Sequence, residues 1–191
     1  YSLDKVFLER FRREAKAAES LQHENICGAY EVGEEQGRHY YVMNLLEGES
    51  LGERLDRENL VLPEEALRIT TEVALALEYA HHKVFIHRDI KPDNIFLTRD
   101  GKVKLLDLGL SKDLTRQHSS DLTQTGIAIG TPNYISPEQV RCHEEVDTRA
   151  DIYSLGGTFY HQLTGMPPFD GIDSTTVIYK HVNEKAADPR D

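Results

Sequence analysis

Asp89, Asn94 and Asp107 carry oxygen atoms and stand at the ends of short apolar runs. Apolar runs of this length, bounded by turn residues, are typical of buried strands. The turn between the runs, Thr98-Arg99-Asp100-Gly101, ends in an Asp-Gly pair, which supplies the positive φ of a tight hairpin. The sequence therefore predicts a hairpin that brings Asn94, before its first strand, close to Asp107, after its second.

Amide and carboxylate oxygens are the ligands that Mg²⁺ prefers in proteins. Asn94 and Asp107, at one end of the predicted hairpin, are therefore candidate ligands of Mg²⁺, with Mn²⁺ as an alternative ion. Asp89 would lie within reach of whatever the metal ion holds. The pattern predicts a metal site with a third, non-ligating carboxylate beside it.

The wider pattern is His87-Arg88-Asp89 with Asn94 five residues after the aspartate, followed by Asp107-Leu108-Gly109. It resembles the catalytic loop and the metal-binding motif of serine/threonine protein kinases, and it is most similar to the eukaryote-like kinases of bacteria. The first motif matches at every specified position. In the second, Leu108 stands where the family has Phe.

The resemblance implies an α+β, protein-kinase-like fold. Residues 1–47 would form part of an N-terminal lobe, with the helix called αC, two strands and the hinge. Residues 48–191 would form a mostly helical and incomplete C-terminal lobe. Because a kinase begins with a Gly-rich loop and a strand that carries a phosphate-contacting lysine, and ends in further helices, we expect a fragment that is poorly active alone.

The resemblance also implies catalytic roles. Asp89 would orient the acceptor hydroxyl and accept its proton, Lys91 would balance charge on the transferring phosphate, and Thr131 would hydrogen-bond both. Outside this frame, Lys91 would be an ordinary surface lysine and Thr131 a plain turn residue. The positions that would contact the nucleotide are Met43, Asn44, Leu46, Lys91, Asn94, Phe96 and Asp107.

The hinge would run from Asn44 and would bond adenine through backbone groups near Asn44 and Leu46. The family often has Glu at the position of Asn44, a departure of little weight because backbone groups make the contact. Met43 would be the gatekeeper, and a methionine there is equally a filler of core gaps. Both readings predict a core residue.

Ser2 to Leu21 carry an apolar stripe at three- and four-residue steps, which predicts an amphipathic helix. In the kinase frame this helix is αC, and Glu14 is the glutamate that pairs with the lysine of the third strand. Without that frame Glu14 would be an exposed surface acid.

Residues 114–130 are polar and rich in hydroxyls, and they match the activation loop. Thr123 and Thr125 correspond to the paired threonines that are phosphorylated in bacterial relatives. Their phosphates would order the loop against a pocket formed by Arg88 and Lys112. Residues 130–138 resemble the substrate-docking segment, with Ser136 replacing the usual Ala.

The remaining elements follow from periodicity and turn residues. We expect strands over Ala29–Glu34 and His39–Leu46, and helices over Ser50–Arg57, Pro63–His82, Thr148–Thr164 and Ser174–Val182. The buried stripe of the long second helix is predicted as Leu67, Thr70, Val73, Ala74, Leu77 and Ala80 or His81. His81 is interpreted as a helix-end histidine that complements the dipole. The resemblance implies that Asp151 is a buried scaffold residue, because the family's residue at this position bonds the backbone of the catalytic loop.

The chain has 191 residues, an apolar content of 39% and a net charge of −11, with the acids dispersed. The charge argues against broad nucleic-acid binding. Cys27 and Cys142 fit no metal spacing and indicate reduced thiols. No run is apolar and long enough to span a membrane, so we expect a cytoplasmic segment, alone or as the cytoplasmic part of a membrane-anchored kinase.

The function predicted from this reading is transfer of the ATP γ-phosphate to Ser or Thr hydroxyls of proteins, regulated by phosphorylation of the activation loop. The expected partners are protein substrates, ATP and a second copy of the chain for trans-autophosphorylation, without nucleic acid or membrane contact. One alternative is a pseudokinase that scaffolds or binds partners, and another is a small-molecule phosphotransferase with a related core. The intact metal and base positions and the docking segment favour the protein kinase.

Overall fold

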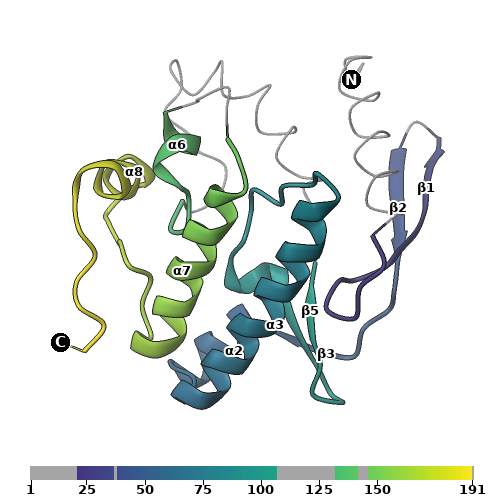
Figure 1. The fold of residues 1–191 in the computed structure, drawn as a ribbon, viewed down its shortest axis with the longest axis horizontal. Helices are drawn as coiled ribbons and strands as arrows, with labels where there is room; N and C mark the ends of the chain where they lie inside the picture. Colours follow the sequence, from purple (N-terminus) through teal and green to yellow (C-terminus); the bar gives the residue numbers. More distant parts are fainter. Residues whose placement is uncertain (1–20, 37, 107–131, 142–145, 191) are drawn as a thin grey trace.

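The computed structural model describes residues 21–36, 38–106, 132–141 and 146–190 (Figure 1). β1 (Ala29–Glu35) pairs with β2 (Arg38–Met43), while β3 (Gly48–Ser50), β4 (Ile95–Thr98) and β5 (Val103–Leu105) form a second antiparallel sheet in that order. The mixture of small sheets and helices confirms the predicted α+β class. The predicted domain boundary between residues 47 and 48 falls between the two sheets, and it stays a prediction.

The two longest helices begin and end where the sequence supplies suitable residues. α3 (Pro63–His82) has the predicted bounds, with Pro63 in the first turn, where a missing N–H is tolerated. α7 (Arg149–Thr164) ends at Gly165, which has a left-handed φ of 77°. A Cβ at Gly165 would lie 2.9 Å from the backbone oxygen of Asn59, so a side chain would clash there. The shorter helices are α2 (Leu51–Glu58), η1 (Pro92–Asn94), α6 (Pro137–Val140) and α8 (Ser174–Asn183).

α3 and α7 pack side by side at the centre of the molecule (Figure 1). The prediction of the buried stripe of α3 was partly wrong, because Leu67 is 59% exposed. Ala66 and Ile69 take the inward positions instead, which rotates the buried face by about one residue. Each fully buried Leu or Ile contributes about 1.5–3 kcal/mol relative to an exposed one. The buried residues of α3 are Ala66, Ile69, Val73, Ala76, Leu77 and Ala80.

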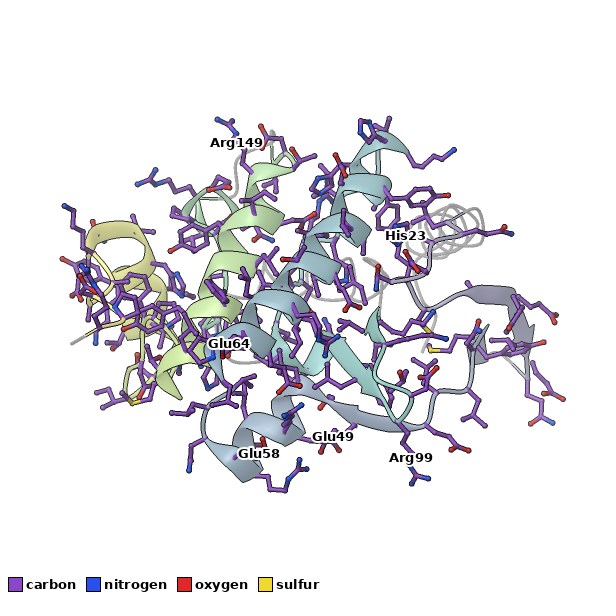
Figure 2. The ribbon with its side chains drawn as sticks, turned by 60° about the horizontal axis from the view of Figure 1, so that its bottom comes forward. His23, Glu49, Glu58, Glu64, Arg99 and Arg149 are labelled. Atoms are coloured by element: carbon purple, nitrogen blue, oxygen red, sulfur yellow. The ribbon has the colours of Figure 1, made fainter. Side chains whose placement is uncertain are left out.

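The segment before β1 is held on the second sheet and on α3. Cys27 donates its N–H to the oxygen of Leu105 at 2.9 Å, and Leu105 donates to the oxygen of Asn25 at 2.8 Å. The Asn25 side chain reaches Glu72 of α3, with 2.9 Å between Nδ2 and Oε2. His23, labelled in Figure 2, lies nearby and stacks on Tyr79 of the same helix. The small N-terminal part is thereby tied to α3, the helix that leads into the loop of Asp89 and Asn94.

Met43 does not lie in the core, contrary to the prediction. Its side chain is 38% exposed, and its neighbours Tyr40 and Val42 are similarly accessible. The β1–β2 ribbon stands at one edge of the described molecule, on the side opposite α8 (Figure 1). A core position for Met43 requires cover on both faces of β2, and the described residues do not supply it.

Candidate active site

The loop after α3 gathers three of the predicted residues. Lys91 places its Nζ 3.2 Å from Oδ2 of Asp89. Asn94 donates from Nδ2 to the same Oδ2 at 3.0 Å and to the backbone oxygen of Asp89 at 2.7 Å. The Asp89 and Lys91 side chains are 21% and 35% exposed, so both reach solvent. The result is an accessible carboxylate whose charge is balanced by a cation and whose direction is set by an amide.

Both backbone groups of Asn94, its N–H and its oxygen, form backbone hydrogen bonds. η1 turns the chain so that Asn94 donates its N–H to the oxygen of Lys91 at 3.0 Å. Leu106 donates to the oxygen of Asn94 at 2.9 Å, which continues the β4–β5 ladder by one step. The predicted hairpin is therefore present, with Asn94 before its first strand and Leu106 after its second.

Of the two predicted metal ligands, the structure describes Asn94 only. Both side-chain hydrogen bonds that Asn94 makes with described residues use Nδ2, so these bonds leave its Oδ1 available. An amide oxygen in this position suits a hard cation. Asp107 lies outside the described residues, directly after Leu106. Within the described ranges no group of three or more His, Cys, Asp or Glu side chains could hold a metal ion.

His87 connects the loop to the end of β5. Its ring is fully buried, with Nδ1 3.2 Å from the N–H of Asp89 and Nε2 2.8 Å from the oxygen of Leu106. Nδ1 must accept from the first group and Nε2 must donate to the second, so the ring is the neutral Nε2–H tautomer. His87 thereby fixes the spacing between Asp89 and the strand that leads to Asp107.

Asp151 of α7 makes the contacts predicted for a scaffold residue. Its side chain is fully buried, and it accepts the N–H of His87 on Oδ2 at 2.9 Å and the N–H of Arg88 on Oδ1 at 2.7 Å. A buried carboxylate is costly unless such donors compensate its lost hydration. Asp151 therefore anchors the catalytic loop to the central helix.

The sequence reading assigned His81 to the helix dipole and missed its main contact. Its Nε2 lies 2.8 Å from Oδ2 of Asp151. The carboxylate therefore has three donors, two from the loop backbone and one from the end of α3. A signal was available, since a buried aspartate needs donors and His81 lies at the end of the helix that leads into the loop.

The segment around Tyr134 is fastened to α7. Ser154 donates from Oγ to the oxygen of Tyr134 at 2.7 Å, and the Tyr134 hydroxyl lies 2.6 Å from Nδ1 of His161. Burial raises the pKa of the Tyr134 phenol and lowers the pKa of the His161 imidazole. Both shifts favour the neutral forms, so the phenol donates to the imidazole. These two contacts fix the position of the segment before α6 along the axis of α7.

The predicted hinge residues lie after β2. The N–H of Asn44 donates to the oxygen of Gly28 at 3.0 Å, and the Cys27 Sγ lies 3.8 Å from the oxygen of Asn44. Leu46 is half-buried, and Phe96 lies on β4 opposite Ser50. Since the N–H of Asn44 is already used, its oxygen and the backbone of Leu46 are the groups left for a nucleotide base. These assignments stay predictions.

Several predicted site residues lie outside the described residues, and their roles stay predictions. They are Glu14, Asp107, Lys112, Thr123, Thr125 and Thr131. Arg88 is described, and its backbone is bonded to Asp151. In the part of the chain that the structure describes, no helix combines the length and apolarity that crossing a membrane requires.

The family match and the similar proteins all indicate a protein kinase domain. The family described as "Protein kinase domain" matches residues 2–189. The probable serine/threonine-protein kinase SCO3848 of Streptomyces coelicolor is 42% identical over 97% of this chain and 28% of its own length. PrkC of Bacillus subtilis is 39% identical over 95% of this chain and 28% of its own length. PknB of Mycolicibacterium smegmatis is 40% identical over 97% of this chain and 30% of its own length. The chain thus spans less than a third of these curated relatives.

Proposed function

Because this chain belongs to the protein kinase domain family, we propose that it is the catalytic part of a serine/threonine protein kinase. The proposed reaction is transfer of the ATP γ-phosphate to Ser or Thr hydroxyls of proteins. The similar proteins are named as kinases of this kind, which supports the proposal. The observation that carries it is the group of Asp89, Lys91 and Asn94, which joins an accessible carboxylate to a cation and a candidate metal ligand.

Asp89 is the proposed base. Its carboxylate would accept a hydrogen bond from the substrate hydroxyl, orient the oxygen for attack, and take up its proton as the new bond to phosphorus forms. The Asn94 amide limits rotation of the carboxylate by donating to Oδ2. Positioning of this kind supplies much of the catalysis in phosphoryl transfer, where the protein does little covalent chemistry.

Lys91 is the proposed charge-balancing residue. Its ammonium group lies beside Asp89 and is partly exposed, so the flexible stem can carry it toward a phosphate. There it would stabilise negative charge on the transferring group. Thr131 is the further residue that we propose to bond both Asp89 and Lys91.

The proposed cofactor site uses the two residues that flank the open end of the β4–β5 hairpin, Asn94 before β4 and Asp107 after β5. Asn94 through Oδ1 and Asp107 through its carboxylate would hold Mg²⁺ or Mn²⁺, which would bind the ATP phosphates and neutralise their charge. Adenine would contact the backbone near Asn44 and Leu46, between Met43 and Phe96.

Regulation and cellular setting are further parts of the proposal. Phosphates on Thr123 and Thr125 would be drawn to Arg88 and Lys112, which orders the activation loop. Glu14 would pair with a lysine on the third strand of the complete N-terminal lobe. We propose protein substrates, a second copy of the chain as the kinase in trans-autophosphorylation, and a cytoplasmic location for this segment.

Phosphoamino-acid analysis tests the proposed function. The complete protein should transfer radiolabel from [γ-³²P]ATP to a generic acceptor protein in a reaction that needs Mg²⁺ or Mn²⁺. Acid hydrolysis should release labelled phosphoserine and phosphothreonine. Label on tyrosine alone, or no transfer by the complete protein in either ion, would contradict the proposal.

A further inference from the structure

Arg88 has a φ of 66°, in the left-handed region that residues with a Cβ rarely adopt. A conformation of this kind persists when the surrounding groups hold it in place. On the N-terminal side, the Arg88 N–H is held by Oδ1 of Asp151 at 2.7 Å. On the C-terminal side, the peptide that joins Arg88 to Asp89 has its N–H 3.2 Å from Nδ1 of His87.

Gln139 holds the opposite edge of that second peptide. Its Nε2 donates to the backbone oxygen of Arg88 at 2.9 Å. Because a peptide group is planar, a bond to its oxygen and a bond to its N–H together restrict its rotation. The next backbone atom is the Cα of Asp89. The direction in which the Asp89 carboxylate leaves the loop is therefore set in part by Gln139, a residue of α6.

The Gln139 side chain is itself fixed by a capping box. Its backbone N–H donates to Oγ of Ser136 at 3.4 Å, and its Oε1 accepts the N–H of Ser136 at 3.2 Å. Ser136 is fully buried. With Oε1 used by the cap, Nε2 is turned toward the loop. One amide side chain thus joins the start of α6 to the catalytic loop.

The position of α6 explains why the bond from Gln139 to Arg88 matters. α6 begins at Pro137, near the end of residues 130–138, which resemble the substrate-docking segment. Ser154 of α7 anchors this segment at Tyr134. A shift of α6 would pull on the Arg88–Asp89 peptide through Gln139.

We propose that Gln139 is a positioning residue for phosphoryl transfer, which keeps the Asp89 carboxylate aimed at the acceptor hydroxyl by holding the Arg88 carbonyl. The inference rests on the proposed kinase function. It differs from the role of Asp151, because Gln139 reaches the loop from the substrate side and holds the peptide that carries Asp89 directly.

The chain offers a matched control. Ser50 and Glu53 form a capping box at α2 with the same geometry, in which Ser50 Oγ accepts the N–H of Glu53 at 3.1 Å and Glu53 Oε2 accepts the N–H of Ser50 at 2.7 Å. Glu53 is exposed, and its side-chain bonds go to Ser50. Loss of this box reports the cost of a cap without a link to the catalytic loop.

The decisive variant is Gln139→Glu in the complete protein, beside Gln139→Ala and the control Glu53→Ala. A glutamate keeps an acceptor for the Ser136 N–H and loses the donor to Arg88. Steady-state kinetics should show a kcat lowered about tenfold or more in both Gln139 variants, since small misplacements of reacting groups are costly. KM for ATP should stay within about twofold, and the melting temperature of Gln139→Glu should stay near that of the unaltered protein, as expected for a change in aim rather than in binding or folding.

The outcomes separate this inference from the proposed function. A kcat of Gln139→Glu within about twofold of the unaltered protein, or an equal loss of kcat in Glu53→Ala, would overturn the positioning role. If the complete protein transfers no phosphate, the proposed function fails, and a crystal structure of Gln139→Glu decides the geometry alone. The inference then requires a rotated Arg88–Asp89 peptide and a displaced Asp89 carboxylate, and an unchanged peptide overturns it.

Discussion

Asp89 and Asp151 are two carboxylates of the same centre in opposite surroundings. Asp151 has a fully buried side chain whose oxygens accept from two backbone N–H groups, with the ring of His81 as a further partner. Asp89 is 21% exposed and meets two polar side chains, the partly exposed Lys91 and the buried Asn94. A carboxylate surrounded by fixed donors holds structure, whereas one that faces solvent can meet a substrate.

The difference predicts which measurements each residue controls. Removing the Asp89 carboxylate should change turnover and leave the fold intact, because Lys91 reaches solvent and Asn94 keeps its bond to the backbone oxygen of residue 89. Removing Asp151 should change stability first, because buried donors would lose their acceptor. Asp151 binds the loop that carries Asp89, so this separation is a demanding test.

Asp89→Asn should give the largest effect on activity. The amide keeps the shape of the side chain and removes the proton acceptor, so kcat should fall about 10²- to 10⁴-fold. Nucleotide affinity, measured by fluorescence titration of the complete protein, should change little. Asp56→Asn, at an exposed position of α2, is the control and should keep its kcat. Unchanged turnover in Asp89→Asn would remove this residue from its proposed role.

Asp151→Ala should give the largest effect on stability. The substitution leaves the buried N–H groups of His87 and Arg88 without their acceptor, which should lower the free energy of unfolding by about 3–5 kcal/mol. Chemical denaturation of the complete protein measures it. Asp147→Ala removes an exposed carboxylate whose bonds go to Arg149 nearby, and it should change stability far less. Equal losses in the two variants would contradict the anchoring role of Asp151.

His81→Ala should have a smaller effect in the same direction. Asp151 keeps its two backbone donors and loses the imidazole, so the free energy of unfolding should fall by about 1–3 kcal/mol. The neighbouring His82 is exposed and provides the control His82→Ala. If both variants unfold like the unaltered protein, the contact between His81 and Asp151 contributes nothing to stability.

Acidification should give the smallest effect, through the half-buried His161 and the buried His181. Burial lowers the pKa of both side chains. An unfolded histidine titrates near pH ~6.5, so the unfolded state gains protons first and the free energy of unfolding should fall as the pH drops from about 6.5 through the lower folded pKa values. Above pH ~6.5 this contribution is constant.

The variant His161→Gln tests the pH dependence, because glutamine keeps an acceptor for the Tyr134 hydroxyl and does not titrate. The loss of stability between pH 7.5 and 5, measured by urea unfolding, should be smaller in this variant. An identical pH dependence would show that the pKa of His161 is the same in the folded and the unfolded protein, which would contradict the prediction.

Local patterns predicted much of the fold. The bounds of α3 were predicted correctly, and the hairpin of β4 and β5 follows from its Asp-Gly turn. The family resemblance, read from His87 to Asn94, is confirmed by the match to the protein kinase domain. These features depend on residues that are close in the sequence, so a single sequence is enough to predict them.

The errors concern tertiary contacts. Leu67 and Ala66 are both apolar, and which one enters the core depends on how α3 packs against its neighbours. Met43 was assigned to a core that the described residues do not build around it. The capping box of Ser136 and Gln139 can be read from the sequence, whereas the bond from Gln139 to Arg88 depends on where α6 lies in space.

The most direct test of the account is a crystal structure of the complete kinase with Mn²⁺ and a non-hydrolysable ATP analogue. The anomalous signal of Mn²⁺ should lie about 2.1 Å from Oδ1 of Asn94 and from a carboxylate oxygen of Asp107. Asp89 should remain outside the metal coordination shell, facing the site of the acceptor hydroxyl. An ion bound elsewhere, or one ligated by Asp89 in place of Asn94, would contradict the account.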